Sequence, residues 1–182
     1  MRFCLAASLL FFSVLAKAQA QPVKWATQET FFADLAGKSL PDFKGLTVDK
    51  KPFSGIELKN QIVVINFWFE KCPPCLAEMP ELNKMVSTYN SSGIRFIGIT
   101  HDLPKTAKKF QKRTGYRYEI ISLTPDEIRK LNINHGYPSN VIVGKSGKIS
   151  YATANISFTD EAFKAKSITF ENKLKAEIDK MK

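Results

Sequence analysis

The sequence contains few residues that bind metals or form structural disulfides, with only three cysteines and two histidines. Cys4 lies in the apolar N-terminal stretch, so Cys72 and Cys75 are the cysteines of the remaining chain. Structural zinc takes four ligands, commonly two cysteine pairs or one pair with two spaced histidines, and the positions of His101 and His135 fit neither template. A disulfide that closes so short a loop removes little conformational entropy from the unfolded chain. The pair therefore indicates redox chemistry.

Beyond residue 20 the sequence lacks any apolar run of the roughly 20 residues that a transmembrane helix needs. The first 20 residues differ, because Arg2 precedes the apolar stretch 3–15 and Ala18-Gln19-Ala20 forms a small-residue cleavage motif. The stretch 3–15 is itself too short to span a bilayer comfortably. We interpret residues 1–20 as a cleaved signal peptide and expect a periplasmic protein.

Acidic residues are fewer than basic ones, 17 against 27, which gives a net charge of +10 at pH 7. This balance favours anionic partners, but export argues against nucleic acid. A helix expected over residues 104–114 concentrates the charge on one face, opposite Ala107 and Phe110. Its basic residues are Lys105, Lys108, Lys109, Lys112 and Arg113. We interpret this face as solvated, and the alternatives are contact with an acidic partner or weak contact with an anionic membrane surface.

Proline and glycine interrupt residues 37–60, where we predict a β-hairpin and a turn. Downstream, strand-like and helix-like segments alternate, which is typical of a central sheet covered by helices on both faces. We therefore predict an α/β fold with a mixed central sheet and an N-terminal β-hairpin extension. Residues 21–36 would form a lead-in, and residues 37–182 a single domain long enough for a substantial core.

The most informative stretch is residues 62–80. Residues 62–69 are apolar and rich in β-branched and aromatic side chains, which predicts a strand buried on both faces. Apolar residues then recur at helical spacing from Cys75 to Tyr89, which predicts an amphipathic helix packed on the sheet. Cys72 would then lie at or near the helix N-terminus.

That position favours nucleophilic chemistry. The unpaired N–H groups and the dipole of a helix N-terminus stabilise the Cys72 thiolate, and Lys71 adds a neighbouring cation. A thiolate attacks disulfides, and Cys75, one turn away, can resolve the resulting mixed disulfide. Pro73 and Pro74 restrict the backbone and should hold the two sulfurs at bonding distance. We expect the Cys72 sulfur to be exposed and Cys75 to lie further inward.

These residues resemble the exported TlpA/ResA-like thiol-disulfide oxidoreductases, which have a thioredoxin fold. The residues that match the family pattern are Asn66, Phe67, Trp68, Cys72, Pro74, Cys75, Glu78 and Pro80. Many relatives carry tryptophan directly before the first cysteine, where this chain has Lys71. The resemblance implies protein thiols and disulfides as substrates, an upstream electron donor, no cofactor, and cytochrome c maturation or reductive repair as the setting.

The resemblance extends to residues 135–139. Pro138 matches the cis-proline that packs against the cysteines in the thioredoxin fold, and the backbone of Tyr137 would then be free to pair with a substrate strand. Glu78, one turn beyond Cys75, would accept or donate the proton of that thiol. Its alternative role is a first-turn carboxylate favoured by the helix dipole. His101, after the next strand, would lie near the thiols or serve as a solvated or capping residue.

We therefore predict a thiol-disulfide oxidoreductase that uses the Cys-Pro-Pro-Cys pair and acts on protein disulfides as a reductant. One alternative is a peroxiredoxin-like thiol peroxidase, although the Pro-x-x-x-Thr-x-x-Cys setting of those enzymes is absent before Cys72. Another is a copper-binding module resembling the Sco family, whose cysteines are separated by three residues and followed by a later histidine. The gap of two residues between Cys72 and Cys75 favours the oxidoreductase.

Overall fold

The computed structural model of the protein describes residues 34–132, 135–156 and 161–181. The expected signal peptide 1–20 and residues 21–33 of the expected lead-in lie outside this part of the chain. The strands are β1 (Lys44–Thr47), β2 (Pro52–Ser54), β3 (Val63–Trp68), β4 (Arg95–Thr100), β5 (Glu119–Ser122), β6 (Ser139–Val143) and β7 (Ile149–Thr153). The α-helices are α2 (Pro73–Tyr89), α3 (Pro104–Thr114), α4 (Pro125–Asn132) and α5 (Glu161–Asp179), and the 3-10 helices are η1 (Gly55–Leu58) and η2 (Asn90–Ser92).

The strands form one seven-stranded sheet in the order β2-β1-β5-β4-β3-β6-β7. Strand β3 is parallel to β4, and β4 is parallel to β5. Strand β6 is antiparallel to β3, and β7 is antiparallel to β6. The sheet is therefore mixed, which confirms the predicted α/β fold.

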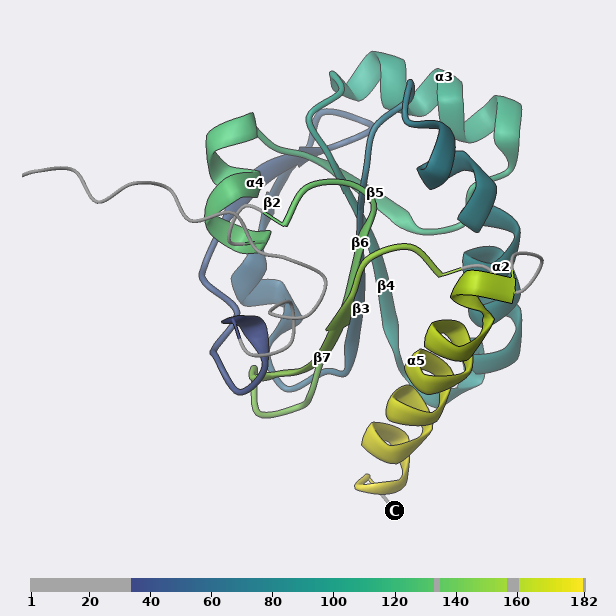
Figure 1. Cartoon of the computed structure of the whole chain (residues 1–182). Coiled ribbons are helices and arrows are strands. Elements are labelled where there is room, and N and C mark those ends of the chain that lie inside the picture. Colours follow the sequence, from purple (N-terminus) through teal and green to yellow (C-terminus); the bar gives the residue numbers. More distant parts are fainter. Residues whose placement is uncertain (1–33, 133–134, 157–160, 182) are drawn as a thin grey trace, which may run out of the picture.

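Helices cover both faces of the sheet, as Figure 1 shows. One core contains buried residues of α2, α3 and α5, and the other contains buried residues of α4 and η1. Every residue of β3 is buried. Val64 and Trp68 belong to the first core, and Val63, Ile65 and Phe67 belong to the second. The apolar run therefore places β3 between two layers of helix, as predicted.

The hairpin extension is also confirmed. Strands β1 and β2 pair antiparallel, with Gly45 opposite Phe53, and β1 then joins the sheet through β5, with Leu46 opposite Ser122. A side chain at Gly45 would meet Leu123 and the backbone of Ser122, so glycine permits this close approach of β1 to β5. The hairpin thereby extends the sheet beyond β5.

Helix boundaries agree with the local sequence signals. Helix α3 spans the predicted residues 104–114, with Ala107 and Phe110 fully buried. Helix α4 begins at Pro125, and the Thr124 hydroxyl accepts a hydrogen bond from the backbone N–H of Glu127. Within the described residues, no helix has both the length and the apolarity that crossing a membrane requires.

Candidate active site

The ends of several strands meet at one edge of the sheet. Because β3, β4 and β5 are parallel, the segments that follow them leave from the same side. Strand β6 runs the other way, and Ser139 at its start pairs with Phe67 near the end of β3. Pro138 is therefore brought next to the segment that carries Cys72 and Cys75. Functional sites of α/β sheets are commonly found at this edge.

Cys72 and Cys75 form a disulfide, with their Cα atoms 5.2 Å apart. Cys72 directly precedes the first residue of α2, and its carbonyl accepts a hydrogen bond from the N–H of Leu76. Its Sγ accepts a hydrogen bond of 3.3 Å from the N–H of Cys75. The predicted position at the helix N-terminus is therefore confirmed, and an N–H group points at the sulfur whose thiolate it would stabilise.

The expected exposure of Cys72 is wrong. Cys72 is only 3% exposed and Cys75 is fully buried, because both belong to the core beneath α2. Phe69 and Tyr137 are half-buried and pack against the same core. The spacing of the motif did not reveal this burial, because the core also contains residues of α3 and α5 that are distant in the sequence.

The supporting residues of the motif divide into exposed and buried ones. Lys71, Pro73 and Pro74 are exposed, and the two prolines occupy the first two positions of α2, where no intrahelical N–H bond is lost. Trp68 is fully buried, with its ring centroid 4.6 Å from that of Phe110. Trp68 thus packs beneath the site, while the prolines shape its surface.

Glu78 is fully buried and is the sixth residue of α2, so it does not occupy the first turn as the helix-dipole alternative assumed. Its carboxylate accepts hydrogen bonds from Asn66 Nδ2 (2.7 Å), Asn140 Nδ2 (3.1 Å) and the N–H of Ile156 (3.0 Å). Burial raises the pKa of Glu78 from 4.5 to about 8, and these three donors oppose that rise. A carboxyl group with this pKa can gain or lose a proton near neutral pH.

A wider polar network surrounds Glu78 inside the core. The hydroxyl of Tyr116 donates to Asn66 Oδ1 at 2.8 Å, and Asn66 Nδ2 also donates to Asn140 Oδ1 at 3.0 Å. Asn140 Nδ2 donates in turn to the carbonyl of Ala154. Sequence analysis missed Asn140 and Ile156 as partners of Glu78, and Tyr116 as a partner of Asn66. The polar Asn140 within the apolar strand β6 was the signal that pointed to a buried network.

Tyr137 and Pro138, which the sequence predicted as a substrate platform, lie directly before β6. The Tyr137-Pro138 peptide bond is cis, and Pro138 is buried. The ring of Tyr137 meets that of Phe69 edge to face at 5.2 Å, and its hydroxyl lies 3.3 Å from His101 Nδ1. His101 therefore lies in an aromatic cluster next to the redox pair, although it is exposed.

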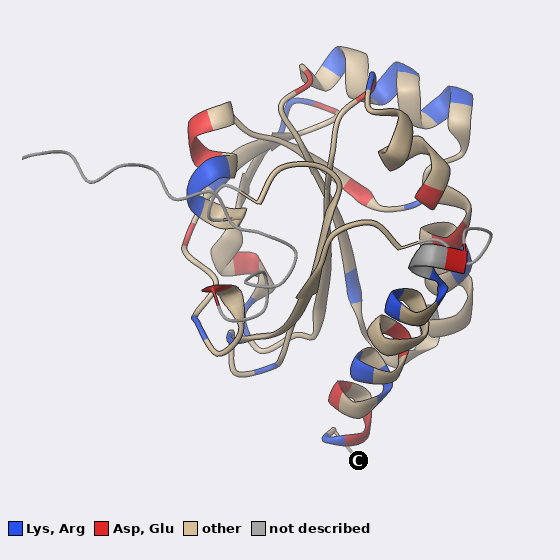
Figure 2. Cartoon of the chain, viewed as in Figure 1, with Lys and Arg blue, Asp and Glu red and all other residues tan. Residues whose placement is uncertain are grey.

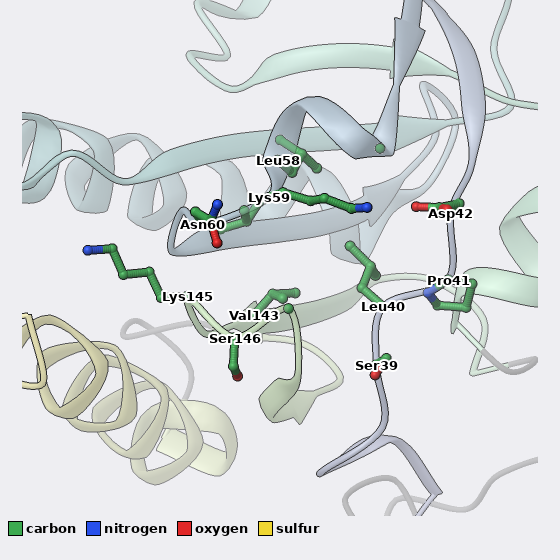
Figure 3. A pocket seen from close by; sticks show the side chains of 13 residues that line it. Ser39, Leu40, Pro41, Asp42, Leu58, Lys59, Asn60, Val143, Lys145 and Ser146 are labelled. Carbon is green, nitrogen blue, oxygen red and sulfur yellow. The ribbon is translucent and has the colours of Figure 1, made fainter.

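Other features lie away from the pair. A cavity of about 270 Å³ at the opposite edge of the sheet includes Val63 at the start of β3 and Val143 at the end of β6. Lys59 and Asp42 point toward one another across it (Figure 3).

Figure 2 shows the basic residues spaced along α3. No cluster of three or more His, Cys, Asp or Glu residues suited to a metal ion occurs in the described part of the chain.

Comparison with known proteins agrees with this geometry. The model of the AhpC/TSA family matches residues 36–152, which is more than half of the chain. The chain belongs to the AhpC/TSA family. It is similar to the thiol-disulfide oxidoreductase ResA of Bacillus thuringiensis, with 28% identity over 149 residues that cover 78% of this chain and 84% of the relative.

Solved structures of Chlorobium tepidum proteins give the same result. A thiol:disulfide interchange protein of the thioredoxin family is 29% identical, with a TM-score of 0.62, and the match covers 80% of this chain and 99% of that one. A putative DsbE is 19% identical, with a TM-score of 0.68 and coverage of 79% and 97%, and shows the shared fold. This AhpC/TSA family member therefore has a thioredoxin-like fold and is a thiol-disulfide oxidoreductase.

Proposed function

We propose that this oxidoreductase reduces disulfides of exported proteins, with Cys72 as the attacking thiolate and Cys75 as the resolving thiol. The observation that carries the proposal is the Cys72–Cys75 pair at the start of α2, backed one turn later by the buried carboxyl of Glu78. The N–H of Cys75 and the helix dipole favour negative charge on Cys72 Sγ. Cys72 is therefore the better nucleophile of the two.

The reaction follows from thiol-disulfide exchange. Cys72 Sγ attacks one sulfur of the partner disulfide, a new S–S bond forms, and the other partner sulfur leaves as a thiolate. Cys75 then gives its proton to Glu78 and attacks Cys72 Sγ, which releases the second partner thiol. The protein ends as the Cys72–Cys75 disulfide, and two electrons have moved to the partner. An upstream dithiol donor must reduce this disulfide before the next turnover.

Two features support the remaining parts of the proposal. Tyr137 packs against the core that contains both cysteines, which supports the proposal that its backbone pairs with an extended substrate strand. The sequence of residues 1–20 supports export to the periplasm, and the family resemblance favours cytochrome c maturation as the setting. Contact of α3 with an anionic membrane surface remains the alternative role of its basic face.

Trapping tests the assigned roles. Without the resolving thiol the reaction stops at the mixed disulfide, so Cys75→Ala should accumulate covalent partners on a non-reducing gel, and Cys72→Ala should not. Purified wild-type protein, reduced by dithiothreitol and freed of it, should reduce insulin disulfides stoichiometrically. If Cys72→Ala traps partners and Cys75→Ala does not, the roles are reversed. Consumption of hydrogen peroxide without reduction of insulin would favour the peroxidase alternative.

A further inference from the structure

A largely apolar groove of about 510 Å³ lies along the same edge of the sheet as the redox pair. The start of β1, the loop after β4 and the loop after β5 form its walls, and we name it the leucine groove after Leu46 and Leu103. Leu103 is 73% exposed and Leu46 is 41% exposed. Large aliphatic side chains gathered in an open groove typically mark a binding surface.

The leucine groove is continuous with the surroundings of the disulfide. His101 and Pro125 line both this groove and a neighbouring cavity of about 230 Å³ that reaches Tyr137. The contact between His101 Nδ1 and the Tyr137 hydroxyl connects the leucine groove with this cavity. The ring centroids of His101 and Phe69 lie 5.1 Å apart. A binding track therefore runs from the residue before Pro138 to Leu46 and Leu103.

The sheet order sets the length of this track. Strand β1 is three positions from β3 in the order β1-β5-β4-β3. Three steps of about 4.8 Å span roughly 14 Å, which an extended chain covers in about four residues. A substrate cysteine at the redox pair would therefore place a residue about four positions away in the leucine groove.

The charged residues around the binding track indicate which residues of a bound segment would lie beside its apolar residue. Lys44 lines the leucine groove and Lys105 is exposed in the first turn of α3, whereas Arg129 in the neighbouring cavity forms an ion pair with the exposed Asp126. Asp102 also lines the groove, but its Oδ2 accepts hydrogen bonds from the N–H of Glu70 (2.6 Å) and the Thr100 hydroxyl (3.0 Å). Lys44 and Lys105 therefore place positive charge next to the groove, which favours an acidic segment.

We propose that the leucine groove binds an extended segment of the partner protein, with a large aliphatic residue about four positions from the reacting cysteine and acidic residues beside it. This inference rests on the proposed function, because it names the substrate class of the same site. Burial of one leucine side chain contributes roughly 1.5–3 kcal/mol, which corresponds to about tenfold or more in affinity. The groove would thus select among disulfides that the redox pair alone does not distinguish.

The test uses two synthetic peptides, each with one cysteine joined in a mixed disulfide to 5-thio-2-nitrobenzoate. One carries leucine about four residues from the cysteine and aspartate next to it, and the other carries serine in place of leucine. Reduced wild-type protein should release thionitrobenzoate from the leucine peptide with about tenfold higher kcat/KM. In Leu46→Ser/Leu103→Ser this preference should vanish. In the control Ile56→Ser/Ile168→Ser, which removes exposed apolar residues elsewhere, the preference should persist.

A binding experiment separates the groove from the chemistry. Oxidised protein is titrated with a fluorescein-labelled leucine peptide whose cysteine is serine, and anisotropy gives the Kd. The Leu46→Ser/Leu103→Ser variant should bind about tenfold more weakly than the control variant. If wild-type protein reduces no disulfide, the proposed function fails, and the anisotropy result still decides the groove.

Three results would overturn the inference. The first is equal behaviour of the two double variants, and the second is a wild-type protein that treats both peptides alike. The third is occupation of the groove by the protein itself. In that case Leu46→Ser/Leu103→Ser would abolish a dimer seen by sedimentation.

Discussion

Asn66 Nδ2 donates a hydrogen bond of 2.7 Å to Glu78 Oε1 in the core behind the disulfide. Both residues are fully buried, so the amide and the carboxyl group interact without competition from solvent. Tyr116 holds the other end of the amide by donating to Asn66 Oδ1. The direction in which the Asn66 amide points therefore determines whether Glu78 meets a donor or an acceptor.

The first prediction concerns the proton of Cys75. Glu78→Gln keeps the shape of the side chain but removes the base, so the attack by Cys72 should keep its rate while the resolving step slows by about 100-fold. Stopped-flow fluorescence with a labelled mixed-disulfide substrate separates the two steps. A resolving rate and a pH profile equal to wild type between about pH 6 and pH 8 would show that Glu78 takes no part in proton transfer.

The second prediction concerns stability against pH. Burial raises the pKa of Glu78 to about 8, so between 4.5 and about 8 the folded protein holds a proton that the unfolded chain has lost. The contribution of this group to the free energy of unfolding is therefore present below pH 4.5 and is lost as the pH rises through about 8. The loss can reach about 1.4 kcal/mol per pH unit.

Urea denaturation of the oxidised protein across this range measures the effect. Glu78→Gln has no group that titrates at this position, so its free energy of unfolding should fall less steeply with pH than that of wild type. Parallel curves for the two proteins would mean that Glu78 titrates near its ordinary pKa in the folded state.

The third prediction compares two stacked tyrosines, whose ring centroids lie 5.1 Å apart. Both are buried, but the Tyr116 hydroxyl bonds Asn66, whereas the Tyr118 hydroxyl has no hydrogen-bond partner within the described residues. Tyr116→Phe should lower the free energy of unfolding by about 1 kcal/mol or more, because Asn66 Oδ1 loses its donor. Tyr118→Phe, the matched control, should change it by less than about 0.5 kcal/mol.

A kinetic readout distinguishes positioning from simple stability. Without the Tyr116 hydroxyl the Asn66 amide is free to turn its oxygen toward Glu78, which disfavours the carboxylate and raises its pKa. The pH midpoint of the resolving step should therefore move upward in Tyr116→Phe and stay in place in Tyr118→Phe. A common midpoint for both variants and wild type would show that Tyr116 does not orient Asn66.

The fourth prediction concerns Gly98 on β4. A Cβ atom there would lie 2.9 Å from Tyr116 Cε1 and 3.0 Å from Trp68 Nε1, closer than packed atoms allow. Gly98→Ala should therefore lower the free energy of unfolding by about 1–3 kcal/mol. Thermal or urea denaturation measures the change. Wild-type stability in this variant would mean that the two aromatic rings move aside without cost.

Local sequence patterns determined much of this molecule. The apolar run of β3 required a strand buried on both faces, and the spacing from Cys75 to Tyr89 required a helix packed on it. Glycine and proline placed the hairpin, and Thr124 with Pro125 placed the start of α4. Each of these features depends on neighbouring residues, so their periodicity and capping chemistry were readable without the fold. The redox pair and its place before a helix followed in the same way.

Only the tertiary structure decided what surrounds that pair. Glu78 receives hydrogen bonds from Asn140 and Ile156, which lie 62 and 78 residues away along the chain. Cys72 lies in a core that also contains buried residues of α3 and α5, and the leucine groove joins β1 to the loop after β4. Such contacts depend on strand order and register, which local sequence leaves open because many pairings satisfy the same alternation of apolar residues. The motif thus determined the chemistry of the sulfurs, while the packing of distant segments determined the buried surroundings of Glu78 and the shape of the leucine groove.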